Sequence, residues 1–216
     1  MTLDFSKINI ESVAIGSLIG LFLKTTFDRV TTALKLNRQR EVILDYSKYI
    51  GLDKSLKFVE DLDYIKKSIL AETKEEILET QQTNYAVDAM PMFTSAIFKS
   101  FSQDELRRTT FNTKNYIKII DITYSIDFLK DYMPLQLWDK YHLKVRQHMK
   151  DDKIKIEDEI KHFQECGYLK TLAKQAVIEI EMKRERAVQT HKQFHSLIDR
   201  LSGWNLIWII KYIIRQ

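Results

Sequence analysis

The stretch YLKTLAKQAVIEIEMKRERAVQTHKQFHSLIDRLS, residues 168–202, contains neither glycine nor proline. Its charged residues stand three and four positions apart, as Glu179 and Lys183 do, and this spacing places oppositely charged side chains on one helix face. Gly203 follows directly, and glycine commonly stands just past the end of a helix. We therefore expect one long helix over residues 168–202.

The whole chain shares this shortage of turn residues. Its 216 residues include 2 prolines and 5 glycines, whereas a sandwich or a doubly wound sheet needs frequent turns. A hydrophobic fraction of 44% beside a charged fraction of 30% provides for both a core and a solvated surface. The composition predicts an all-α fold, arranged as an elongated antiparallel helical bundle.

Hydrophobic periodicity and punctuation divide the chain into successive helices. Gly51 is expected to stop one helix and Asp53 to cap the next. Ser102 and Glu105 have the spacing of a capping box, and Pro134 suits the start of a helix. The expected helices are 8–36, 38–50, 53–82, 84–101 with a kink at Pro91, a short one from 102, 114–132, 135–166, 168–202 and 204–215. We group residues 1–36 as an N-terminal apolar helix, 37–203 as the bundle and 204–216 as an amphipathic C-terminal helix.

The N-terminal helix contains the uncharged run SVAIGSLIGLFL, residues 12–23. Extended to residues 8–27, the segment is about 30 Å long, enough for one membrane span. Ser12, Gly16 and Gly20, spaced by four, form a small-residue seam that lets another helix approach closely in lipid. More basic residues follow the segment than precede it, which places the bundle on the cytoplasmic side. We predict a single-span anchor. A helix buried in a core or interface is the alternative, and the acidic start of the chain fits a cleaved signal peptide poorly.

The C-terminal helix is too short to span a bilayer but has a distinctive aromatic face. Trp204, Trp208 and Tyr212 are spaced by four, Lys211 and Arg215 flank them, and aliphatic residues fill the opposite side. Aromatic rings bordered by cations suit the headgroup region of a membrane. The alternative is that this face docks on the bundle or on a partner chain.

The histidines offer only partial metal-binding patterns. His191 and His195 share a helix face and would need a third ligand from elsewhere, and Lys192 replaces the glutamate of a zincin motif. Glu159-x-x-His162 matches half of a di-iron motif, without the second half. Cys166, the only cysteine, is expected as a small buried residue beside a helix stop at Gly167. We expect neither a metal nor a cofactor.

One short motif suggests catalysis. The sequence Arg186-Ala-Val-Gln-Thr-His191 resembles the Arg-x4-His motif of HEPN-type ribonucleases, which are helical bundles. The resemblance implies that Arg186 would stabilise phosphate charge and that His191 would act as a general acid or base. Members of the family commonly have a polar residue after the arginine, where this chain has Ala187.

Charge bears on the class of partner. The 34 basic and 30 acidic residues are interleaved, so the net charge of +4 does not mark a nucleic-acid binder. The preferred interpretation is a membrane-associated, mostly cytoplasmic, non-catalytic bundle that acts through contacts with a protein partner or with copies of itself. The alternatives are a cytoplasmic helical subunit of a larger complex, with both terminal helices buried in interfaces, and the ribonuclease.

Overall fold

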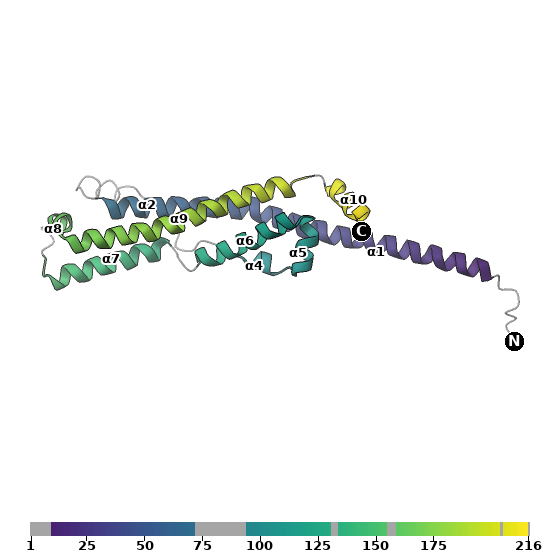
Figure 1. Cartoon of the computed structure of the whole chain (residues 1–216), viewed down its shortest axis with the longest axis horizontal. Coiled ribbons are helices and arrows are strands. Elements are labelled where there is room, and N and C mark those ends of the chain that lie inside the picture. The colour runs from purple at the N-terminus through teal and green to yellow at the C-terminus, as the bar shows by residue number, and fades with distance from the viewer. Residues whose placement is uncertain (1–9, 72–93, 131–133, 155–158, 204, 216) are drawn as a thin grey trace, which may run out of the picture.

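The computed structural model describes residues 10–71, 94–130, 134–154, 159–203 and 205–215. Within these ranges every regular element is a helix, which confirms the predicted all-α bundle. The molecule is elongated, and one helix projects far beyond the rest (Figure 1). The expected kink at Pro91 and the expected helix end at residue 82 lie outside the described residues.

The first three elements form one continuous helical rod. α1 (Ile10–Tyr46) passes through a π-helical turn, η2 (Ser47–Gly51), into α2 (Leu52–Leu70). Gly51 has φ −60° and ψ −46°, which are ordinary right-handed helical values. The predicted stop at Gly51 is therefore wrong, and Asp53 lies in the first turn of α2 rather than capping it.

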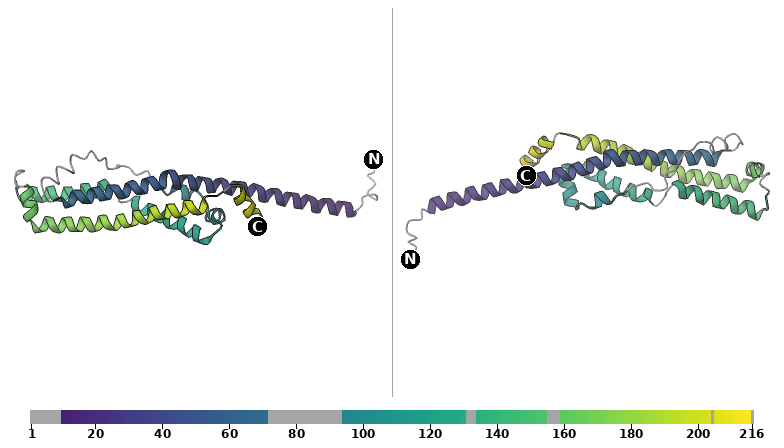
Figure 2. Two further views of the ribbon diagram at one scale, coloured as in Figure 1. Left: turned by 90° about the horizontal axis from the view of Figure 1, so that it is seen from above. Right: turned by 180° about the vertical axis from the view of Figure 1, so that it is seen from behind.

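The long helix predicted from residues 168–202 is confirmed as α9 (Gly167–Leu201). It lies beside α2, α6 (Thr113–Lys130) and α7 (Pro134–Asp151), as both Figure 1 and Figure 2 show. Gly167, expected as a helix stop, is instead the first residue of α9. Pro134 begins α7 as predicted, and α6 confirms the helix expected over residues 114–132 as far as Lys130, the last described residue before α7.

Two short helices lead into α6. α4 (Ala96–Lys99) is followed by α5 (Gln103–Thr110), which opens with the predicted capping box. The Ser102 hydroxyl accepts from the Glu105 amide at 3.2 Å, and the Ser102 amide donates to the Glu105 carboxylate at 3.0 Å. Each bond satisfies a backbone amide that the start of a helix leaves unpaired.

The predicted single helix over residues 135–166 is wrong. α7 ends at Asp151, and α8 (Glu159–Glu165) is a separate short helix before α9. Lys153 has φ 56°, the left-handed conformation that terminates a helix, although such a residue is more often glycine. Its amide bonds to the Lys150 carbonyl, and the Ile154 amide bonds to the Met149 carbonyl at 3.0 Å.

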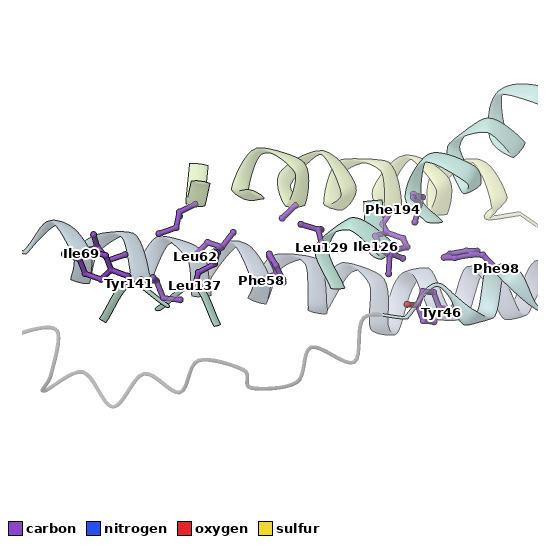
Figure 3. Close-up of a cluster of buried hydrophobic side chains, with 14 of the residues drawn as sticks. Tyr46, Phe58, Leu62, Ile69, Phe98, Ile126, Leu129, Leu137, Tyr141 and Phe194 are labelled. Atoms are coloured by element: carbon purple, nitrogen blue, oxygen red, sulfur yellow. The ribbon is translucent and has the colours of Figure 1, made fainter. Parts of the chain in front are cut away.

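The main core runs along the interface of α2, α6, α7 and α9 (Figure 3). Phe58, Leu62 and Ile65 of α2 recur at helical spacing and are at most 2% exposed. Tyr46 meets Phe98 edge-to-face, with ring centroids 5.4 Å apart. A second, smaller core joins α1 to α10 (Asn205–Arg215) and consists of Ala33, Leu36, Trp208 and Tyr212.

Candidate functional site

The N-terminal half of α1 leaves the bundle and stands alone (Figures 1 and 2). Its large apolar side chains are between 55% and 71% exposed: Ile15, Leu18, Ile19, Leu21, Phe22, Leu23 and Phe27. We call this segment, residues 14–27, the projecting segment. Exposed apolar patches of this kind usually mark an interaction site.

The apolar side chains of the projecting segment surround the helix. Leu21, Phe22 and Leu23 are consecutive, and successive residues of an α-helix point about 100° apart. A helix that is apolar on all sides is normally surrounded by other apolar groups. The projecting segment is therefore not buried in the protein's own core, which was one of the alternatives for it.

The small-residue seam of the projecting segment is open. A Cβ built on Gly16 or on Gly20 would meet nothing within 4 Å. Ser12 lies one turn earlier in the same helix. The backbone of α1 is thus accessible to a second helix along this side, and the absence of side chains allows a close approach.

The threonines that follow carry their own hydrogen-bond partners. The hydroxyls of Thr25, Thr26, Thr31 and Thr32 donate to carbonyls four residues earlier, at 2.8–2.9 Å. These hydroxyls are satisfied within α1 and need no partner from water.

The predicted membrane span over residues 8–27 is not supported. In the part of the chain that the structure describes, no helix combines the length and apolarity that crossing a bilayer requires. The uncharged run ends at Lys24, and a span needs about twenty predominantly apolar residues. Ile8 and Asn9 lie outside the described residues.

The aromatic face of α10 docks on the protein itself. Trp208 and Tyr212 are 8% and 2% exposed and pack against α1, and the ring of Phe111 meets that of Trp208 at a tilt, with ring centroids 4.6 Å apart. These two rings therefore face protein rather than a membrane. Lys211 is exposed, Arg215 ends the helix, and Trp204 lies outside the described residues. The outward face of α10 is aliphatic, and it exposes Leu206, Ile207, Ile210 and Ile214.

Arg40 of α1 holds the start of α10, a role that the sequence did not indicate. Its guanidinium donates to the Leu201 carbonyl at 3.0 Å and to the Asn205 side chain, and it lies 5.7 Å from the centroid of the Trp208 ring. The residue is 2% exposed, and this burial lowers the pKa of the Arg40 guanidinium.

A cavity of about 620 Å³ lies between α10, the α5–α6 connection and the end of α9. Three cationic residues line it, namely Arg40, Arg200 and Lys211, together with Asn115 and Ser202. Arg200 also donates to the Asn115 side chain at 3.1 Å. No carboxylate is among the described residues that line this cavity, and its three cationic residues favour an anionic group.

In the histidine pair of α9, His191 makes hydrogen-bond contacts within the protein. His191 and His195 meet edge-to-face at 4.8 Å, but Nδ1 of His191 contacts the Ser55 hydroxyl at 2.9 Å and the Leu52 carbonyl at 3.2 Å. Burial, and secondarily His195, lower the pKa of the His191 imidazole. Among the described residues, no third ligand joins this pair.

The ribonuclease motif lies on an uninterrupted helix. Arg186 and His191 are five residues apart in α9, which places them about 140° apart around its axis. The neighbouring Arg184 forms a two-pronged ion pair with Asp63 of α2, at 2.5 and 3.0 Å. The structure thus does not bring Arg186 and His191 to one face of α9.

Comparison of the chain with protein-family models, with curated proteins and with solved structures finds no match.

Proposed function

We propose that this chain is a membrane-associated helical-bundle protein that acts through protein contacts rather than catalysis, with the projecting segment immersed in lipid. The observation that carries this proposal is the exposure of seven large apolar side chains on an isolated stretch of α1. Such a surface is costly in water, because burial of apolar area is worth about 25 cal/mol per Å².

Lipid is favoured as the occupant because the apolar residues surround the helix. A single partner helix would cover one side of the projecting segment, whereas acyl chains cover all sides at once. Residues 14–23 extend about 15 Å as a helix, half of the roughly 30 Å hydrocarbon core. The proposal is therefore contact with one leaflet and not a span.

Cations at the base of the projecting segment support the same arrangement. Lys24 and Arg29 follow the apolar run on α1, and Lys211 is an exposed residue of α10. The cationic cavity beside α10 adds the exposed Arg200. Basic residues near an anionic membrane surface contribute about 1 kcal/mol each to binding.

Co-sedimentation with lipid vesicles tests the proposal. We expect the protein to pellet with phosphatidylcholine vesicles that contain phosphatidylserine, and Leu18→Glu/Phe22→Glu to remain in the supernatant. The matched control is Tyr124→Glu/Ile178→Glu, because these residues are similarly exposed, at 67% and 69%, but lie on the bundle. No pelleting of the wild-type protein, or equal pelleting of both double variants, would refute the lipid contact.

A second candidate, self-association through the small-residue seam, is favoured by the open space at Gly16 and Gly20. This candidate corresponds to the alternative given by the sequence, a subunit of a larger complex whose terminal helices are buried in interfaces. We expect Gly16→Ile/Gly20→Ile to lower the mass measured by analytical ultracentrifugation without vesicles. A wild-type monomer that still binds vesicles would favour lipid alone, and a vesicle-independent oligomer would favour the subunit.

A further inference from the structure

Four potential metal ligands meet at the end of the bundle opposite the projecting segment. Figure 1 shows α8 there, beside the end of α7 and the start of α9. His148 lies in the last turn of α7, Asp152 directly follows that helix, His162 lies in α8, and Cys166 is the N-cap of α9. These residues are unrelated to the proposed membrane contact.

The end of α7 explains why the chain returns to this point. The left-handed Lys153 reverses the backbone, and Ile154 then packs against the main core, near the buried Met149. This hydrophobic contact and the two terminal hydrogen bonds of α7 are the features of a Schellman motif. The reversal allows α8 to present His162 to the residues that end α7.

The ligand atoms converge on one small volume. One ligand atom each from His148, His162 and Cys166 lies within 4.8 Å of the others. Nε2 of His148 is 3.3 Å from Sγ of Cys166 and 3.3 Å from Oδ2 of Asp152. The same carboxylate oxygen is 3.7 Å from Nε2 of His162.

Three of the six distances between these ligand atoms, His148–Cys166, His148–Asp152 and His162–Asp152 at 3.3–3.7 Å, are close to the edges of a tetrahedral zinc site. Zinc–nitrogen bonds of about 2.05 Å and a zinc–sulfur bond of about 2.3 Å, at tetrahedral angles, separate the ligand atoms by about 3.3–3.6 Å. Two imidazoles, a thiolate and a carboxylate are also a donor set that zinc prefers, and calcium and magnesium do not.

The geometry does not match a catalytic Cys-His-Asp triad. In such a triad the nucleophile and the carboxylate contact different nitrogens of the imidazole. Here both Cys166 and Asp152 contact the same atom, Nε2 of His148. A thiol–imidazole hydrogen bond alone would also leave His162 unexplained, because its Nε2 is buried and has no hydrogen-bond partner in the described protein.

We propose that His148, His162 and Cys166 bind one zinc ion, with Asp152 as the fourth ligand. The ion would join the end of α7, α8 and the start of α9. A zinc ion that binds only the folded chain adds its binding free energy to stability.

Zinc titration of the metal-free full-length protein tests the site. We expect one zinc ion per chain, measured by inductively coupled plasma mass spectrometry after removal of excess metal, and a rise in the unfolding midpoint. Cobalt(II) should give the visible bands of a tetrahedral site and a sulfur-to-cobalt charge-transfer band. A zinc content that does not level off at one ion per chain would overturn the proposal. Cobalt spectra without the sulfur-to-cobalt charge-transfer band would overturn it as well.

Variants assign the ligands. We expect Cys166→Ser to remove the charge-transfer band and His162→Ala to weaken zinc binding at least tenfold, with circular dichroism showing that each remains helical. Asp152→Asn should weaken binding, and unchanged affinity would exclude Asp152 as the fourth ligand. The matched controls are His191→Ala and His195→Ala, on the same chain but distant from the cluster. Equal zinc affinity in Cys166→Ser, His162→Ala and the controls would refute the site.

Discussion

Gly51 lies directly against the ring of Phe194. A Cβ built on Gly51 would be 2.6 Å from both Cε1 and Cζ of Phe194, closer than packed carbon atoms can be. Gly51 belongs to the π-helical turn η2, and Phe194 is a fully buried residue of α9. The helical rod and α9 can therefore approach each other at this level only because residue 51 lacks a side chain.

We expect Gly51→Ala to destabilise the protein. Overpacking of a core costs about 1–3 kcal/mol, and this exceeds the gain of about 0.5–1 kcal/mol from replacing a helical glycine by alanine. Urea denaturation followed by circular dichroism would measure the change. The matched control is Gly20→Ala, also within the rod, where a Cβ meets nothing within 4 Å and no loss is expected. If Gly51→Ala matched the control, the close packing would be refuted.

The same glycine shows what the sequence could and could not predict. Turn scarcity and hydrophobic periodicity suffice for the all-α fold, for α9 and for the capping box at Ser102. A glycine that ends a helix and a glycine that admits a neighbouring ring look identical in one sequence. Only the position of Phe194, which lies 143 residues after Gly51 in the sequence, shows that Gly51 is of the second kind.

Arg40 should control the docking of α10. We expect Arg40→Ala to lose about 1.5–3 kcal/mol of stabilisation, the typical value of a hydrogen bond to a charged group, because the Leu201 carbonyl loses its donor. The contact with the Trp208 ring is lost as well. Limited trypsin digestion should then cleave faster at Lys211. Arg38→Ala is the control, because Arg38 is exposed on the same helix. Equal cleavage of the two variants would count against the assignment.

Two buried tyrosines should respond oppositely to removal of the hydroxyl. Tyr46 donates to the Thr94 carbonyl at 2.6 Å, so Tyr46→Phe should cost about 1 kcal/mol. The Tyr141 hydroxyl is buried without a hydrogen-bond partner in the described protein, and burial raises the pKa of Tyr141 to about 12. Tyr141→Phe should be neutral or stabilising by up to about 1 kcal/mol. Chemical denaturation of the two variants measures both. A larger loss for Tyr141→Phe would show that its hydroxyl has a partner.

The candidate sites were less predictable than the fold, because each depends on contacts between distant parts of the chain. The apolar run of residues 12–23 is plain in the sequence, but its exposure depends on where the bundle ends. The docking of Trp208 depends on Arg40, which is distant in the chain. The proposed zinc ligands form two pairs with helical spacing in the sequence, His148-x3-Asp152 and His162-x3-Cys166. The break after Asp151, which brings the pairs together, was not expected.

Two half-buried histidines, His142 and His191, should make stability depend on pH. Burial, more than any charged neighbour, lowers the pKa of His191 and of His142 below the ordinary histidine value. Between the lowered and the ordinary pKa the unfolded chain binds more protons than the folded one, so the free energy of unfolding falls as the pH falls through this window. His191→Gln should flatten this dependence, because glutamine does not titrate and can still pair with Ser55. Urea denaturation at a series of pH values from 7.5 to 5 measures the slope. Lys192→Gln, exposed and adjacent, should leave the slope unchanged, and a His191→Gln slope equal to that of the wild type would exclude His191 as a source.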